Sequence, residues 1–151
     1  MAQVQDCCLA LYNSVLVAVD GSKFSELALD EGINIAKACK SRLFVINVID
    51  TNEEFMALAP DLEDLIEDKA KELLDKSRDK AAAQDVNCET IVHFDYQTYR
   101  PIIKEAQERK ISLIIVGSHG HSALERTMMG SVSLRVVAHS PCPVLVIPAG
   151  F

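Results

Sequence analysis

Val15-Leu-Val-Ala-Val-Asp-Gly-Ser22 joins an unbroken apolar, β-branched run to a short polar turn. A run of this kind is typical of a strand buried on both faces, and Asp-Gly-Ser is typical of a sharp turn. Ser22 is also a suitable N-cap for a helix that we expect to continue to about Lys40. The segment therefore predicts a strand, a turn and a helix in that order.

The same alternation of apolar runs and helical patterns continues to Ile147. Strands are expected at residues 15–19, 43–49, 88–94, 111–116 and 144–147. Helices are expected at residues 22–40, 61–83, 98–109 and 130–139. The first two helices have predicted buried faces formed by Phe24, Leu27, Ala28, Ile35 and Ala38, and by Leu62, Leu65, Ile66, Leu73 and Leu74. Strands that alternate with helices predict an α/β fold, a single-domain open parallel five-stranded sheet with helices on both faces. The run 88–94 is less apolar and is expected nearer a sheet edge.

The composition predicts one soluble globular domain. The chain has 151 residues, of which 49% are hydrophobic and 25% are charged, and this length is enough to bury a substantial core. A net charge of −7 argues against general binding to nucleic acid or to anionic membranes. The five cysteines contain no C-x-x-C pair, which favours reduced thiols in a cytosolic protein.

Residues 1–13 are expected to form an extension ahead of a folded domain at residues 14–151. The first six residues include no Lys or Arg, and polar residues interrupt the apolar run from Cys7 to Val19. The run is too short to span a bilayer and lacks the basic start of a signal peptide. We therefore expect a cytoplasmic protein without a membrane partner.

Glycines concentrate where the fourth strand ends and the last helix begins. Gly117-Ser-His-Gly120 follows the run 111–116, and Gly130-Ser131 opens the helix at 130–139. Glycine lets backbone N–H groups approach an anion, and the free N–H groups and dipole of a helix amino terminus favour a phosphate. The Ser131 hydroxyl can add a donor. Taken alone, these glycines fit ordinary turns and a helix start equally well.

The turns after the first and fourth strands are expected to line one crevice, because open parallel sheets bind ligands at the carboxyl ends of their strands. Asp20 lies in the first of these turns. By itself it fits a turn former at the start of a helix as well as it fits a ligand contact.

Four stretches of the chain are similar to the universal stress protein family. They are Val15-Leu-Val-Ala-Val-Asp20-Gly-Ser22, Asn47-Val48-Ile49-Asp50, Gly117-x2-Gly120-x9-Gly130-Ser131 and Cys142-Pro143-Val144-Leu-Val-Ile-Pro148. The likeness runs in register from residue 14 onward. The Gly-x2-Gly-x9-Gly-Ser pattern marks the branch of the family that binds ATP. The resemblance implies a Rossmann-like fold of the adenine nucleotide alpha hydrolase-like type, with strand order 3-2-1-4-5.

The resemblance also implies a set of nucleotide-binding residues: Ala18, Val19, Asp20, Val48, Val116, Gly117, His119, Gly120, Gly130, Ser131 and Val132. In this set Asp20 contacts the ribose or adenine region, Val48 contacts the adenine edge, and the glycines and Ser131 hold the phosphates. The implied ligand is ATP, with or without Mg²⁺. The implied assembly is a homodimer, in which the exposed edge strand Val144–Ile147 pairs with the same strand of a second copy.

The favoured function is that of an ATP-binding regulatory protein of the stress response with an unidentified protein partner. No P-loop pattern is present, and no Lys is placed to neutralise a γ-phosphate. One alternative is a slow ATPase or phosphotransferase, for which Arg126 is the candidate cation. The other is a dimeric interaction module that binds AMP or no nucleotide. No catalytic residue is assigned, and no metal site either: His119, His121 and Cys142 lack a fourth ligand and are better interpreted as exposed loop histidines and a thiol.

Overall fold

Strands and helices alternate along the chain in the computed structural model, which describes residues 11–51, 57, 61–121, 129–148 and 150. The strands are β1 (Ser14–Ala18), β2 (Arg42–Ile49), β3 (Cys88–Phe94), β4 (Leu113–Gly117) and β5 (Val144–Ile147). The helices are α2 (Lys23–Cys39), α4 (Asp61–Ala82), α5 (Tyr99–Glu108) and α6 (Ser131–His139). The predicted elements are confirmed, with bounds that agree to within about two residues.

The strands form one parallel sheet in the order β3-β2-β1-β4-β5. β1 is central, because Val15 is paired with Leu43 of β2 on one side and with Leu113 of β4 on the other. β3 lies at an edge, as its lower apolar content predicted, and β5 lies at the opposite edge. The chain moves outward from β1 to β3 and then crosses back to β4. The strand order therefore reverses beside β1, where open α/β sheets bind ligands. The predicted fold class and strand order are confirmed.

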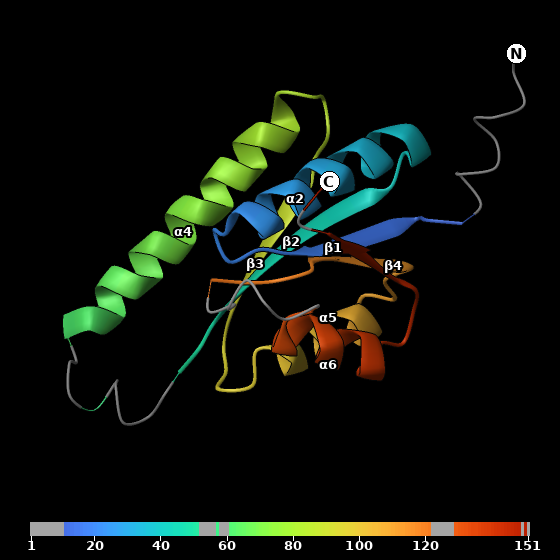
Figure 1. The fold of residues 1–151 in the computed structure, drawn as a ribbon. Coiled ribbons are helices and arrows are strands. Elements are labelled where there is room, and N and C mark those ends of the chain that lie inside the picture. The colour runs from blue at the N-terminus through green and yellow to red at the C-terminus, as the bar shows by residue number, and fades with distance from the viewer. Residues whose placement is uncertain (1–10, 52–56, 58–60, 122–128, 149, 151) are drawn as a thin grey trace, which may run out of the picture.

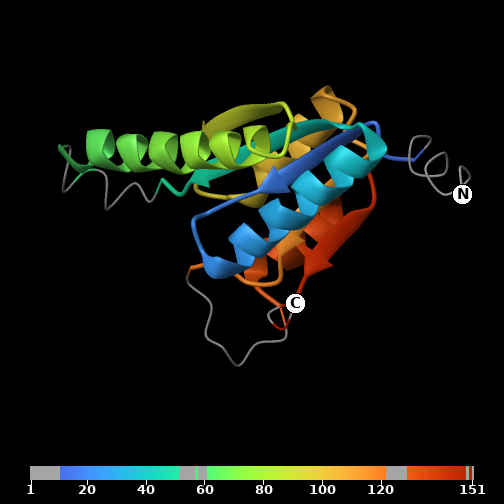
Figure 2. The ribbon, with the colours of Figure 1, turned by 90° about the horizontal axis from the view of Figure 1, so that it is seen from above.

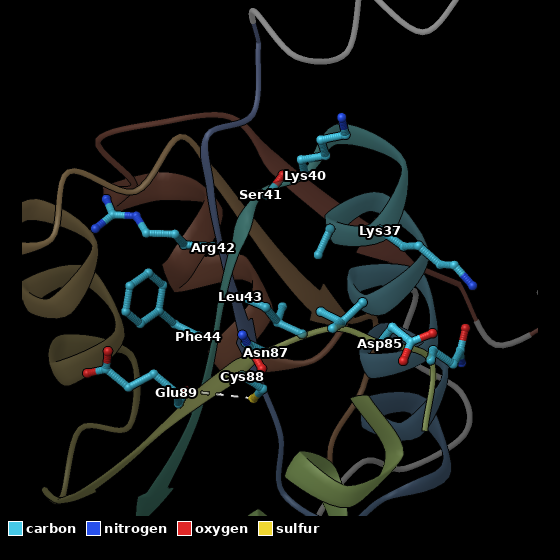
Figure 3. Close-up of a pocket in the computed structure, with 13 residues that line it drawn as sticks. Lys37, Lys40, Ser41, Arg42, Leu43, Phe44, Asp85, Asn87, Cys88 and Glu89 are labelled. Atoms are coloured by element: carbon cyan, nitrogen blue, oxygen red, sulfur yellow. Dashed lines mark hydrogen bonds between the residues drawn. The ribbon is translucent and has the colours of Figure 1, made fainter. Parts of the chain in front are cut away.

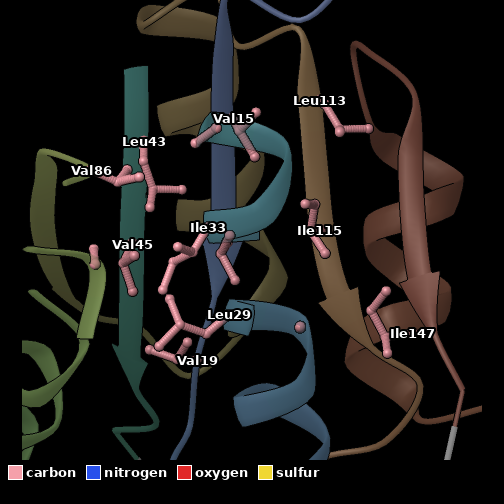
Figure 4. Close-up of a cluster of buried hydrophobic side chains, with 14 of the residues drawn as sticks. Val15, Val19, Leu29, Ile33, Leu43, Val45, Val86, Leu113, Ile115 and Ile147 are labelled. Carbon is pink, nitrogen blue, oxygen red and sulfur yellow. The ribbon is translucent and has the colours of Figure 1, made fainter. Parts of the chain in front are cut away.

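Two apolar cores lie on opposite faces of the sheet. Helices α2 and α4 cover one face, and α5 and α6 cover the other (Figure 1). Successive side chains of a strand point to opposite faces. Val15 and Val17 accordingly belong to the core beneath α2 and α4 (Figure 4), and Leu16 belongs to the core beneath α5 and α6. We call these the first core and the second core.

Helix α2 begins as predicted, and its buried face includes small residues that the sequence did not single out. The Ser22 Oγ accepts a hydrogen bond from the Ser25 N–H at 3.2 Å, which confirms the N-cap. The side chains buried beneath the helix are mostly small: Ser25, Ala28, Leu29, Gly32, Ile33, Ala36 and Cys39. The predicted face is confirmed at Ala28, and Leu27 and Ile35 are half-buried against the first core. Phe24 is also half-buried, whereas Ala38 is exposed and the prediction is wrong there. The helix backbone approaches the sheet closely at Gly32, where a Cβ would lie 2.4 Å from the side-chain Cγ2 of Val17.

Helix α4 is covered by the sheet over only part of its length. Ala70, Leu74 and Ala81 are buried, whereas Leu65 is 49% exposed. Figure 2 shows that the amino-terminal part of the helix extends past the strands. The prediction that Leu65 faces the core is therefore wrong, because no strand lies beside this part of the helix to bury the side chain.

The described chain is anchored from Tyr12 onward. Tyr12 packs against the first core, and the Asn13 carbonyl accepts a hydrogen bond from the Arg42 N–H at 2.9 Å. Residues 1–10, including Cys7 and Cys8, lie outside the described residues, so the division into 1–13 and 14–151 stays a prediction. None of the helices in the described ranges combines the length and the apolar composition needed to cross a bilayer.

The three cysteines in the described ranges are shielded to different degrees. Cys39 is buried, and Cys88 and Cys142 are half-buried thiols. Burial raises the pKa of Cys88 to about 11 and also raises the pKa of Cys142. Cys88 and Cys142 are therefore mainly protonated near neutral pH, which makes them poor nucleophiles.

Candidate functional site

A cavity of about 770 Å³ opens at the carboxyl ends of the strands. The ends of β1, β2 and β4, the connection between β3 and α5, and the first turns of α6 all contribute to it. Its lining contains every residue for which the sequence predicts a nucleotide contact: Ala18, Val19, Asp20, Val48, Val116, Gly117, His119, Gly120, Gly130, Ser131 and Val132. The volume lies in the range of small-molecule sites, roughly 300–1,000 Å³.

One wall of the cavity is apolar and continuous with the second core. It consists of Ala18 from β1, Ile46 and Val48 from β2, Val116 from β4 and Ile102 from α5. These positions share the sheet face that α5 and α6 cover. Such a wall suits a flat apolar or aromatic group better than it suits a charged one.

Two hydrogen bonds fasten the loop after β4 to the start of α6. The Gly130 N–H donates to the Ser118 carbonyl at 2.7 Å, and the Ser133 Oγ donates to the Gly117 carbonyl at 2.7 Å. The Ser133 side chain is buried, so solvent competes little for its bond. The two glycine stretches of the sequence pattern therefore form one structural unit.

At each of the three glycines of this unit, a side chain would meet a different neighbouring residue. A Cβ on Gly117 would lie 2.8 Å from the carbonyl carbon of Phe24, and a Cβ on Gly120 would lie 2.7 Å from Oδ2 of Asp20. A Cβ on Gly130 would lie 3.3 Å from the Ser118 carbonyl oxygen. The absence of a side chain at Gly117 thus permits close packing of α2 on the sheet, which differs from the expected role of bringing N–H groups to an anion. The Ser118 N–H, which follows it, already donates to the Ile147 carbonyl at 2.8 Å.

The amino terminus of α6 leaves backbone donors at the cavity. Gly130 is the N-cap and has no side chain that could accept the first N–H groups. The N–H groups of Ser131 and Val132 have no acceptor among the residues that the structure describes. These donors and the positive end of the helix dipole favour an anion at this point.

Asp20 ties together the two loops at the mouth of the cavity. Its Oδ1 accepts the Ser22 N–H at 2.9 Å, and its Oδ2 accepts the His121 N–H at 3.0 Å. Burial alone would raise the pKa of Asp20, but the hydrogen bonds from Ser22, His121 and Ser25 outweigh it and lower the pKa below 3.8. The carboxylate therefore stays ionised at neutral pH. The structure shows the turn-forming role that the sequence left open, and a contact with a ligand stays a prediction.

Asn47 holds the end of β1 against β2. Its side-chain Nδ2 is buried and donates to the Val19 carbonyl at 2.7 Å, while the Val19 N–H donates to the Ile46 carbonyl at 2.9 Å. The residue belonged to one of the stretches that resemble the family, but the sequence assigned it no role. The hydrogen bond from Asn47 holds the backbone of Val19, at the end of β1, beside β2, which carries Val48. Val19 and Val48 both line the cavity.

The sequence missed one side of the cavity altogether. Tyr96, Gln97, Thr98 and Tyr99, from the connection between β3 and α5, line it together with Arg135 of α6. The helix start near Tyr99 was visible in the sequence, but only the strand order brings this connection to the site. Arg126, the cation that the sequence proposed, lies outside the described residues.

A second cavity, of about 600 Å³, lies at the amino ends of β2 and β3 (Figure 3). Lys37, Lys40 and Arg42 contribute positive charge to its lining, and Asp85 and Glu89 contribute negative charge. None of the residues predicted for the nucleotide site lies here. Mixed charges at the amino ends of parallel strands do not define a ligand class, so the cavity at the carboxyl ends is the candidate site.

The loop histidines have different surroundings. His121 is exposed, whereas His119 is half-buried, with its ring 5.3 Å from the Phe24 ring and its Nδ1 2.9 Å from the Ser118 Oγ. The prediction that both histidines are exposed is therefore wrong for His119, because Phe24 and Ser118 pack against it. Within the described ranges, no group of three or more His, Cys, Asp or Glu side chains could hold a metal ion.

The chain matches known proteins over nearly its whole length. The model of the universal stress protein family matches residues 11–148. Universal stress protein YxiE of Bacillus subtilis is 34% identical over 148 residues, which cover 91% of this chain and 99% of the relative. The chain therefore belongs to the universal stress protein family, as the resemblance predicted.

Solved structures of the same family share the fold. Universal stress protein UspA from Lactobacillus plantarum superposes with a TM-score of 0.78 at 30% identity, covering 90% of this chain and 97% of that one. A universal stress protein in complex with cAMP superposes with a TM-score of 0.66 at 25% identity, covering 91% and 97% of the two chains. A cyclic adenine nucleotide is thus bound by a relative with this fold.

Proposed function

We propose that this chain binds ATP in the cavity at the carboxyl ends of its strands and acts as a regulatory protein of the stress response. The observation that carries the proposal is the start of α6. The N–H groups of Ser131 and Val132 have no acceptor within the described part of the chain, and they lie beside the glycine loop that the Gly130–Ser118 hydrogen bond joins to the helix. Free N–H groups at a helix amino terminus are well suited to a phosphate.

The other parts of the lining fit the rest of an adenine nucleotide. The apolar wall around Val48 suits the base, and the carboxylate of Asp20 can accept hydrogen bonds from ribose hydroxyls. The relative in complex with cAMP supports an adenine nucleotide as the ligand class. Asp20 and Asp50 are the carboxylates of the described lining, and they would be the protein ligands of a Mg²⁺ ion that accompanies a triphosphate.

The same lining favours a protein that holds ATP bound over an enzyme that hydrolyses it rapidly. Efficient phosphoryl transfer needs a base that positions the nucleophile and cations that stabilise the transferred group. The lowered pKa of Asp20 makes its carboxylate a weak base, and Arg135 is the single Lys or Arg among the described residues of the lining. We therefore expect bound nucleotide to act by bracing the loops after β1 and β4, with any hydrolysis slow. An unidentified protein partner and a cytoplasmic location belong to this proposal.

Co-purified nucleotide tests the proposal directly. The purified protein is denatured, the released small molecules are separated by chromatography, and ADP formation from added ATP is followed over hours. We expect ATP to be recovered or to bind on titration, with little ADP formed. The absence of any adenine nucleotide binding would contradict the proposal, and rapid ADP formation would favour an enzyme instead.

We also propose that two copies pair through β5. This strand lies at the sheet edge, and the neighbouring α6 leaves Leu134 and Val137 about half exposed. An apolar edge strand with unpaired backbone groups is suited to antiparallel pairing with its own copy. Sedimentation at micromolar concentration should show a dimer, and a monomer under these conditions would rule the pairing out.

A further inference from the structure

Arg135 is a cation that the nucleotide site, as described so far, does not use. It lies four residues after Ser131 on α6, and both residues line the cavity. Residues four apart share a helix face, and long side chains lean toward the amino terminus of their helix. Arg135 therefore shares a helix face with Ser131, whose N–H group opens the helix at the cavity.

An aromatic side chain holds Arg135 in place. Its guanidinium carbon lies 5.4 Å from the centre of the Tyr99 ring, and that ring lies 5.1 Å from the ring of His139, one turn further along α6. An arginine stacked on an aromatic face has its planar donors pre-oriented and loses less freedom when it binds an anion. Tyr99 also lines the cavity, so the stacked pair forms part of its wall.

Among the described residues, no carboxylate neutralises the charge of Arg135. Arg135 is also the only Lys or Arg in the described lining, where Asp20 and Asp50 supply negative charge. A tightly bound polyphosphate needs a cation to offset its charge, and an arginine guanidinium can bind phosphate oxygens with two parallel hydrogen bonds.

We propose that Arg135 contacts the second and third phosphates of a bound nucleotide. This contact makes the site bind ATP more tightly than AMP. The proposal rests on the proposed nucleotide site and assigns a selectivity to it. The uncapped N–H groups of α6 can serve one phosphate by themselves. Only a longer phosphate chain then gains from Arg135, so its removal should weaken ATP binding and leave AMP binding nearly unchanged.

The test is a titration of ATP and AMP against the wild-type protein and three variants. Arg135→Gln keeps most of the side-chain length but removes the charge, and Arg135→Lys keeps the charge. Arg42→Gln is the matched control, because Arg42 is also stacked on an aromatic ring, 5.7 Å from the Phe44 ring centre, but lies at the amino end of β2 and outside the lining. Unfolding midpoints of the nucleotide-free proteins show whether each variant is folded.

Arg135→Gln should lower the ratio of ATP affinity to AMP affinity about tenfold, the effect of losing one charge-assisted hydrogen-bond contact. Arg135→Lys should fall between the wild type and Arg135→Gln, because lysine keeps the charge but lacks the planar stacked donors. Arg42→Gln should match the wild type. An unchanged ratio in Arg135→Gln, or an equal loss for both nucleotides, would overturn the assignment while leaving nucleotide binding itself intact. If the wild type binds neither nucleotide, the proposed function fails and this inference fails with it.

Discussion

A Gly130→Val variant should lose about a hundredfold in ATP affinity while remaining folded. Gly130 has φ −71° and ψ 157°, a conformation that valine adopts readily. The added Cβ would lie 3.3 Å from the Ser118 carbonyl oxygen and 3.4 Å from Cα of His119, so the branched side chain would fill the space between the β4 loop and α6. A phosphate kept from two backbone donors, each worth about 1.5 kcal/mol or more, gives the expected loss.

Titration calorimetry of the variant and the wild type measures this loss. Gly150→Val is the matched control, because a Cβ at Gly150 meets no atom within 4 Å. It should bind ATP as the wild type does. Undiminished ATP binding by Gly130→Val would falsify the assignment of the phosphate cradle.

A Gly117→Ala variant should instead damage the fold, lowering the free energy of unfolding by about 3 kcal/mol. Its Cβ would lie 2.8 Å from the carbonyl carbon and Cβ of Phe24 and 2.9 Å from the Phe24 carbonyl oxygen. Phe24 lies in the first turn of α2, so its backbone can yield only if the helix moves away from the sheet. Rotation of a flexible side chain cannot relieve this contact.

Urea unfolding without nucleotide measures the effect of Gly117→Ala. Gly150→Ala again serves as the control and should unfold like the wild type. A change of less than about 0.5 kcal/mol, which is typical of unconstrained surface positions, would show that α2 tolerates the methyl group and that the packing argument is wrong. The pair of glycine variants thus separates a ligand-facing position from a packing position within one sequence pattern.

The sequence predicted the elements well because their signals are local. An unbroken β-branched run such as Val15–Val19 and a capping residue such as Ser22 depend on their immediate neighbours. The strand order came from the resemblance to a family and is confirmed by the structure. With that order in hand, the carboxyl ends of β1, β2 and β4 had to meet, which explains why the predicted site residues lie around one cavity.

Signals that depend on packing were not visible. The backbone of α2 approaches the sheet closely at Gly32, beside the Val17 side chain, and Leu65 is exposed because α4 extends beyond the sheet. Arg135 has the pattern of an ordinary solvent-facing residue, and its place in the cavity follows from how α6 lies beside α5. Tyr99, the first residue of α5, reaches the same cavity after the chain leaves the edge strand β3, which no local pattern could indicate.

The two tyrosines of the cavity wall give the protein an optical property. The chain has no tryptophan and three tyrosines, and two of these, Tyr96 and Tyr99, line the nucleotide cavity. The third, Tyr12, packs against the first core at the other end of the sheet. Two of the three tyrosines of the unlabelled protein therefore lie at the cavity, and a Tyr12→Phe background would leave tyrosine emission from these two alone. Occupancy could then be followed by emission, without a dye attached to the protein.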